Sequence, residues 1–401
     1  MEEWKEYKLG EIVISVKDRI NTSVLNISSY ISTENMLPNK AGVTLSSSVP
    51  SGNAIKFVAD DVLISNIRPY FKKIWQADRI GGCSSDVICL RAANITEPSF
   101  LYYLLSQDRF FDYVMKGSKG TKMPRGDRSQ IMQWPVLLPS KNTQQRIASI
   151  LKSLDDKIEV NRKINENLEQ QAQALFKSWF VDFEPFKDCE FVESELGMIP
   201  KGWRVGKLGD FVKTTSGGTP SRKVDDYYIN GNINWVKSKE LQNTFIAETE
   251  EKITEEAIKN SSAKLLPTHS VLIAMYGATV GEFGITTRPM TCNQAVCALL
   301  PNKNVPYSIL YTFARNNKNE LINKAIGSAQ QNISQVIIKN MSFVFNDKAF
   351  FDFNYIIDPM LRQIESNILE SRRLASLRDT LLPKLMSGEI KVNDMRLSEK
   401  Q

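Results

Sequence analysis

Apolar side chains recur in steps of four and three along residues 146–183, and this spacing predicts one long helix. Residues at this spacing share one helix face and form a seam that meets a single partner helix. The segment contains no Pro or Gly that would interrupt the helix. The apolar seam positions include Ile147, Leu151, Leu154, Ile158, Leu168 and Leu175.

Two asparagines, Asn161 and Asn165, fall in the middle of this seam. A buried Asn in a coiled coil lowers stability but fixes the register and the choice of partner. A second seam near the C-terminus is also diluted by polar residues, Ser371 and Arg378. Its apolar positions include Leu361, Ile364, Ile368 and Leu382. We predict an antiparallel helix pair with a globule at each end; the alternative is two ordinary amphipathic helices on separate cores.

Short strand-like runs precede the first long helix and alternate with turns rich in Gly, Ser, Asn and Asp. Examples are Ile55–Val58, Val62–Ile67 and Val87–Leu90. A helix is expected over Ser99–Met115, and Phe71 is expected to belong to the core.

The two halves of the chain resemble distant copies of each other. Five short matches occur in the same order in both halves, and shared order is much less prone to chance than any single match. They pair 7–11 with 206–210, 61–65 with 270–274, 83–87 with 292–296, 117–118 with 327–328, and 129–131 with 334–336. Two such copies would present similar surfaces to a ligand with approximate twofold symmetry, such as duplex DNA.

The predicted fold is therefore α+β, with two similar mixed α/β globules separated by two long antiparallel coiled-coil helices in a pseudo-twofold arrangement. The expected segments are a first globule 1–143, a central helix 144–183, a linker 184–202, a second globule 203–346, a C-terminal helix 347–390 and a flexible tail 391–401.

Composition narrows the possible chemistry. No apolar run is long enough to cross a bilayer, and the charged N-terminus lacks a signal-peptide core, so we expect a cytoplasmic protein without a membrane partner. The five cysteines include no CxxC pair, and His269 is the single histidine, which argues against a metal site and against Ser-His-Asp catalysis. A net charge of +6 permits nucleic-acid binding.

Candidate DNA contacts in the first globule are basic or amide side chains on turns. Lys and Arg on a Gly-rich loop can follow a phosphate backbone, and Arg can contact guanine through two hydrogen bonds. The alternative is a solvated surface loop. The candidates are Asn66, Arg68, Lys72, Lys119, Lys122, Arg125 and Arg128.

Candidates in the second globule are hydroxyl, amide and basic side chains, and Asn and Gln are suited to adenine. The loop 214–223 lacks the GxxxxGK[ST] spacing of a Walker loop. The alternative for each candidate is a capped turn. The candidates are Thr215, Ser216, Thr219, Arg222, Lys237, Lys239, Tyr276, Thr279, Gln330, Gln331 and Asn332.

Several stretches closely resemble the specificity subunit of type I restriction–modification enzymes. They are LFKSWFVDFEPF, ESELGMIPKGW, TTSGGTPSR, KITEEAIKNSSAKLLPTHSVLIAMYGATVGEFGI and LLPKLMSGEI, with ISNIRPYFKKIW and GGCSSDVICL in the first globule. The resemblance implies two target-recognition domains, each reading one half of a split double-stranded DNA target, with the helices setting the spacing. It implies two methyltransferase subunits that dock on the helices and bind S-adenosylmethionine. Motor-nuclease restriction subunits would use ATP and Mg²⁺ in the full complex.

The resemblance implies no active site and no bound cofactor or metal in this chain. The residues agree, because we find no [DN]-P-P-[FY] motif, no GxGxxG after a strand and no nuclease carboxylate cluster. Two alternatives stay open at this stage: a coiled-coil scaffold that does not read DNA bases, and a self-sufficient methyltransferase or nuclease.

Overall fold

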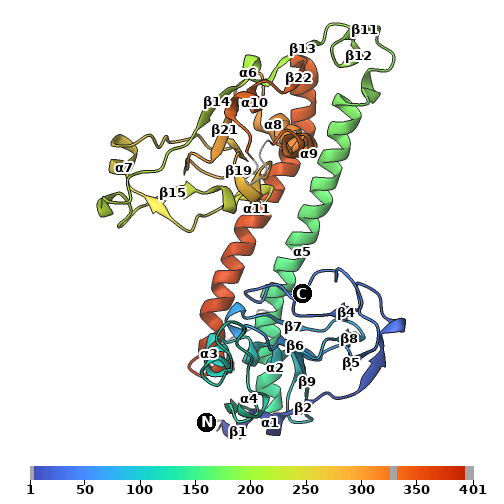
Figure 1. Cartoon of the computed structure of the whole chain (residues 1–401), viewed down its shortest axis with the longest axis vertical. Helices are drawn as coiled ribbons and strands as arrows, with labels where there is room; N and C mark the ends of the chain where they lie inside the picture. Colours follow the sequence, from blue (N-terminus) through green and yellow to red (C-terminus); the bar gives the residue numbers. More distant parts are fainter. Residues whose placement is uncertain (1–3, 326–331, 393–401) are drawn as a thin grey trace. The chain divides into compact units, whose positions relative to one another are not determined.

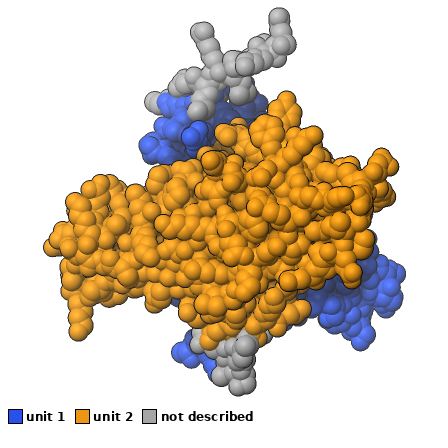
Figure 2. Space-filling model, turned by 90° about the horizontal axis from the view of Figure 1, so that it is seen from above, with its two compact units in different colours: residues 1–158, 373–401 blue, residues 159–372 orange. Residues whose placement is uncertain are grey.

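The computed structural model describes residues 4–325 and 332–392. The chain forms two compact units, shown in different colours in Figure 2 and described separately below. Unit 1 holds residues 1–158 and 373–401, and unit 2 holds residues 159–372. The matched pair 327–328 and most of the expected tail lie outside the described residues.

Unit 1 contains two four-stranded sheets and one strand pair (Figure 1). The first sheet has the order β2 (Val13–Ser15), β9 (Val87–Ala92), β6 (Val62–Ser65), β7 (Ile74–Gln76). The second has the order β3 (Arg19–Asn21), β5 (Asn53–Phe57), β8 (Gly81–Cys83), β4 (Tyr30–Ile31). Strand β1 (Lys5–Lys8) pairs with β10 (Pro135–Leu138). The short helix α1 (Leu9–Ile12) directly follows β1, α4 (Arg128–Ile131) precedes β10, and η1 spans Thr22–Val24.

The single helix expected over Ser99–Met115 is two helices, α2 (Pro98–Leu105) and α3 (Asp108–Lys116). The prediction was wrong here because the backbone of Gln107 is extended, with φ −69° and ψ 143°. The buried Gln107 amide donates to the carbonyl of Leu104 and stabilises the break. Apolar spacing runs across the break and so conceals it.

Unit 2 repeats the strand order of the first sheet of unit 1 and adds one strand at its edge, whereas its second sheet has three strands instead of four. Its main sheet has the order β14 (Lys213–Ser216), β21 (Val296–Leu300), β18 (Val271–Ala274), β19 (Phe283–Thr286), β16 (Thr244–Ile246). A second sheet has the order β17 (Lys252–Ile253), β15 (Ile233–Val236), β20 (Thr291–Cys292), and β13 (Arg204–Lys207) pairs with β22 (Ser342–Phe345). The predicted duplication is thus present in the main sheet, whose first four strands have the same order in both units, and in the separate strand pair.

The matched starts of the two globules fold alike. Lys8 N donates to Glu11 Oε2 at 2.6 Å, and Lys207 N donates to Asp210 Oδ2 at 2.9 Å. In each case the carboxylate caps a four-residue helix, α1 in unit 1 and α6 (Leu208–Phe211) in unit 2.

The remaining elements of unit 2 surround these sheets. The helices are α7 (Glu255–Lys259), α8 (Tyr307–Asn316), α9 (Lys318–Asn323) and α10 (Gln335–Lys339), with 3-10 turns η4 (Asp225–Tyr227) and η5 (Ser238–Glu240). The expected linker 184–202 contains η3 (Glu184–Phe186) and an antiparallel hairpin of β11 (Phe191–Ser194) and β12 (Gly197–Pro200).

The two long helices are α5 (Lys141–Phe180) and α11 (Asp347–Met386), and each has 40 residues (Figure 1). Their ends are part of the hydrophobic cores. The core of unit 1 includes Ile147, Leu151, Leu382 and Leu385. The core of unit 2 includes Leu361 and Ile364, with Leu168, Leu175 and Ile368 packed against it. Leu154 and Ile158 are half-buried.

Tyrosines also attach each globule to a long helix. Tyr103 donates to Asp155 Oδ2 at 2.7 Å in unit 1, and Tyr307 donates to Asp358 Oδ1 at 2.9 Å in unit 2. Burial raises the pKa of both phenols, so they stay protonated and donate to the carboxylates.

Within unit 2 the helix pair is antiparallel and joined by amides. Asn161 is fully buried, and its Nδ2 donates to Glu370 Oε2 at 2.8 Å and to Ser371 Oγ at 3.2 Å. Asn367 Nδ2 donates to Asn165 Oδ1 at 2.8 Å. These directional contacts favour one alignment of the two helices, since a shift of one helix would leave buried amides without partners.

Replacing Asn161 with Ala tests this network. The change removes several buried hydrogen bonds, so we expect unit 2 to lose about 1–3 kcal/mol of unfolding free energy. Urea unfolding followed by tryptophan fluorescence measures the loss. Asn167→Ala is the matched control, because Asn167 is exposed on the same helix, and it should change stability by less than about 0.5 kcal/mol. Equal effects of the two variants would contradict the role of the network.

Candidate nucleic-acid interface

The predicted contacts of the first globule meet where strand β6 ends. Ile67 and Arg125 form an isolated antiparallel bridge, and Arg68 N donates to the carbonyl of Pro124 at 2.8 Å. Two stretches that are far apart in sequence, one with Asn66 and Arg68 and the other with the basic loop, therefore lie side by side. Asn66 Oδ1 and Arg68 Nε are buried and have no hydrogen-bond partner among the described residues.

The cations of the basic loop are exposed, and most of them have a partner. Lys119 pairs with Asp127 at 2.8 Å, Arg125 with Asp86 at 3.3 Å, and Arg128 donates to the carbonyl of Ser85 at 2.6 Å. Lys122 has no ion-pair partner within the part of the chain that the structure describes. Exposed ion pairs contribute little stability, so a phosphate group could replace these carboxylates at small cost.

Lys72 lies at the other end of the same turn, which includes η2 (Pro69–Phe71). Its ammonium pairs with Asp108 at 3.0 Å. Phe71, expected in the core, has 37% of its surface exposed, so that prediction was wrong. The backbone is left-handed at Arg68 and Lys72, with φ +49° and +51°, so the chain turns here and does not continue the strand.

The second globule has an equivalent turn after β18. Tyr276 and Asn332 form an isolated bridge like that of Ile67 and Arg125. Thr279 ends η6 (Gly277–Thr279) and donates to the carbonyl of Tyr276 at 3.2 Å. The structure thus brings Tyr276, Thr279 and Asn332 together, while Gln330 and Gln331 lie outside the described residues.

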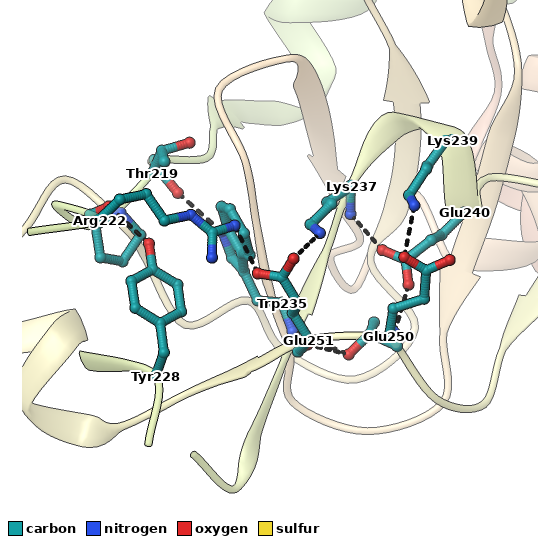
Figure 3. Close-up of polar contacts among 12 residues, drawn as sticks. Thr219, Arg222, Tyr228, Trp235, Lys237, Lys239, Glu240, Glu250 and Glu251 are labelled. Atoms are coloured by element: carbon teal, nitrogen blue, oxygen red, sulfur yellow. Dashed lines mark hydrogen bonds and ion pairs between the residues drawn. The ribbon is translucent and has the colours of Figure 1, made fainter. Parts of the chain in front are cut away.

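A second group of polar residues in unit 2 surrounds one carboxylate (Figure 3). Glu251 accepts a hydrogen bond from Arg222 at 2.5 Å and another from Lys237. The Arg222 guanidinium lies 4.3 Å from the Tyr228 ring centroid and 5.2 Å from that of Trp235. We call Arg222, Tyr228, Trp235, Lys237 and Glu251 the Glu251 cluster. The Lys237 ammonium lowers the pKa of the Glu251 carboxyl.

Backbone pairing positions this cluster. Trp235 lies in β15 and Lys237 directly follows it, and Glu251 directly precedes β17, which pairs with β15. The Trp235 indole donates to the carbonyl of Gly218 at 3.0 Å and ties the glycine-rich loop to the sheet. A side chain at Gly218 would meet atoms of Ser262 and Ala263 at 2.3–2.5 Å, so the close approach of this loop requires glycine.

The other predicted residues of this loop are engaged in the structure. Thr219 donates to Gln294, and Thr215 accepts from Lys264 at 2.9 Å. Thr215 and Ser216 belong to β14 and are half-buried. Lys239 pairs with Glu250 at 2.5 Å, beside the Glu251 cluster in Figure 3.

Sequence reasoning missed Glu251, Tyr228 and Trp235. No spacing rule connects them, because their contacts arise only after β15 and β17 pair. Arg222 and Lys237, the partners of Glu251, were selected for their charge. A search for the nearest acidic run would have drawn attention to residues 248–251.

Across residues 4–325 and 332–392, no group of three or more His, Cys, Asp or Glu side chains could hold a metal ion. None of the helices formed by these residues combines the length and apolar character needed to span a bilayer. Four of the cysteines, Cys83, Cys89, Cys292 and Cys297, are buried free thiols, and Cys189 is exposed.

Comparisons with known proteins agree on one family. The type I restriction modification DNA specificity domain matches residues 1–170 and again residues 200–345. The type I restriction enzyme HindI specificity subunit of Haemophilus influenzae is 27% identical, over 97% of this chain and all of that protein. The MjaIX specificity subunit of Methanocaldococcus jannaschii is 32% identical, over 74% of this chain and 70% of that protein.

A solved structure shares the fold. The crystal structure of the type I restriction-modification S subunit from M. genitalium aligns with a TM-score of 0.60 at 14% identity and covers 96% of each chain. Because the family domain occurs twice and covers most of the sequence, the chain belongs to the type I restriction modification DNA specificity family.

Proposed function

We propose that this chain is the DNA-recognition subunit of a type I restriction–modification complex. Each globule reads one half of a bipartite target. The observation that carries this proposal is the repeated turn after β6 and β18, which has the same backbone bridges but different polar side chains in the two globules. A repeated scaffold with different side chains is what reading two different half-sites requires.

We assign the base contacts of the first globule to Asn66, Arg68 and Arg125. Asn is suited to adenine and Arg to guanine, and their positions on one bridged turn support joint use. Lys72, Lys119, Lys122 and Arg128 would contact phosphates.

In the second globule, Tyr276, Thr279 and Asn332 occupy the equivalent turn. The Glu251 cluster and Lys239 add a basic and aromatic surface, which suits a phosphate backbone and stacked bases. Gln330 and Gln331 remain candidates because they directly precede Asn332 in sequence.

Catalysis belongs to partner chains in this proposal. Two methyltransferase subunits would dock on the long helices and bind S-adenosylmethionine, and restriction subunits would supply the ATP- and Mg²⁺-dependent nuclease. The complex would work in the cytoplasm, where both its DNA and its methyl donor occur. The recognition domains would correspond to the segments 1–143 and 203–346.

Exchanging residues 1–143 for the equivalent segment of another specificity subunit tests the function directly. Methylation sequencing of cells that contain the matching methyltransferase subunit should show that one half of the target changes and the other half is kept. A change in both halves, or in neither, would contradict the proposal. The scaffold alternative predicts a target that does not depend on this chain.

Transfer of a labelled methyl group to DNA tests the division of labour. The purified chain alone should transfer none above background, and adding methyltransferase subunits should start the reaction. Robust transfer by the chain alone would overturn the proposed role.

Glu251→Gln tests the Glu251 cluster. Loss of the carboxylate makes the net charge of the Glu251 cluster more positive by one, so non-target DNA should bind more tightly. The slope of log K against log salt should steepen by about one unit. Filter binding by the assembled methyltransferase at several salt concentrations measures both quantities.

Glu195→Gln is the matched control, because it makes the same change in charge at an exposed position between β11 and β12. It should leave the salt slope unchanged. If the two variants behave alike, the Glu251 cluster does not contact DNA.

A further inference from the structure

The turn after β6 carries two exposed aromatic rings that the proposed contacts leave without a role. Tyr70 has 47% of its surface exposed and Phe71 has 37%. Their ring centroids are 4.6 Å apart, so the rings support each other. The Tyr70 hydroxyl has no hydrogen-bond partner among the described residues. The ring planes are tilted by 53°, and a ligand with a stacking surface would cover the exposed Tyr70 ring.

The turn is held rigidly on both sides. Arg68 N donates to Pro124 O at 2.8 Å, Asn39 N to Phe71 O at 2.8 Å, and Lys40 N to Lys72 O at 3.0 Å. The Lys72 ammonium is anchored by Asp108. The backbone that carries Tyr70 is therefore already ordered before any ligand binds. This order lowers the entropic cost of inserting the Tyr70 side chain into a ligand.

The second globule shows that this backbone does not require these side chains. Ser65 N donates to Lys73 O at 3.1 Å, and Ala274 N donates to Glu282 O at 2.8 Å, which aligns the turn 68–72 with the turn 277–281. At both ends of the second turn the left-handed residue is glycine, with φ +70° at Gly277 and +81° at Gly281.

The first globule places Arg68 and Lys72 at these positions, with φ +49° and +51°. Side chains strain a left-handed backbone, whereas glycine does not. Glycine at these two positions would relieve the strain. That Arg and Lys occupy them indicates that the two cationic side chains have a function. In the second turn Thr279 stands where Tyr70 stands, and Val280, at the place of Phe71, is buried.

The surroundings of the rings match the chemistry of nucleic acid. Arg68, Lys72 and Lys73 surround the rings along the chain with positive charge, which suits phosphates. Asn66 Oδ1 and Arg68 Nε are buried on the same turn and have no hydrogen-bond partner among the described residues.

We propose that Tyr70, supported by Phe71, inserts at a base step of the half-site read by the first globule and partly unstacks it. This inference rests on the proposed function and adds to it a local distortion of the DNA. Apolar and aromatic wedges insert most easily at flexible pyrimidine–purine steps. We therefore expect the chain to prefer targets whose first half contains a pyrimidine–purine step, even though it reads no base edge at that step.

The test uses the assembled methyltransferase and duplexes of the target found by methylation sequencing. 2-Aminopurine is placed in turn at each position of both half-sites except the methylated adenines, which are excluded because the methyltransferase itself can extrude them. When the complex with the natural chain binds, 2-aminopurine fluorescence should rise several-fold at one step of the first half-site.

Tyr70→Thr installs the residue that the second turn uses at this place. The signal should disappear, and target affinity should fall by about 10- to 100-fold. Tyr70→Phe keeps the ring and should retain the signal. Ile80→Thr removes an exposed apolar side chain of the first globule, 61% exposed and outside the proposed contacts, and should leave the signal unchanged.

The possible outcomes separate the two claims. If the natural complex binds its target specifically but fluorescence rises at no position of the first half-site, the insertion of Tyr70 is contradicted. The proposed function is unaffected by that result. A signal that persists in Tyr70→Thr would also contradict the insertion. Failure of the natural complex to bind any target specifically would overturn the proposed function and the wedge together. An unchanged unfolding temperature of Tyr70→Thr shows that the variant folds.

Discussion

Burial of the ends of the two long helices completes both hydrophobic cores, and the globules depend on this contact. Ile147 and Leu385 are fully buried in unit 1, as are Phe353 and Ile357 in unit 2. A fully buried side chain of this size contributes about 1.5–3 kcal/mol. Each globule therefore folds onto helices that it shares with the rest of the chain, and the hydroxyls of Tyr103 and Tyr307 add directional contacts at these junctions.

The proposed recognition surface is arranged differently from the cores. Its side chains lie on turns whose backbone is fixed by isolated bridges, Ile67 with Arg125 and Tyr276 with Asn332. Because the bridges use backbone atoms, the side chains at these positions can differ without disturbing the turn. The use of backbone atoms for the bridges explains how two globules with the same main-sheet strand order can carry different polar side chains on equivalent turns.

Much of the fold could be predicted from the sequence because its signals are periodic. The spacing of Leu151 and Leu361 predicted the long helices, and the paired motifs predicted the duplication. The break at Gln107 and the exposure of Phe71 could not be predicted, because both depend on backbone angles that apolar spacing does not encode. Likewise, the candidate cations were selected by charge, but their carboxylate partners, such as Glu251, are determined by strand pairing.

The fusion of two unlike copies in one chain has a consequence for direction along the DNA. Arg68 and Gly277 occupy matching positions, as do Arg125 and Asn332, so under the proposed function the two globules would read different patterns of hydrogen-bonding groups. Duplex DNA has two equivalent strand directions, and a symmetric reader would bind in either. The proposed reader, with these unlike residues, would distinguish the two directions, and an enzyme bound to it would then have one defined orientation on the double helix.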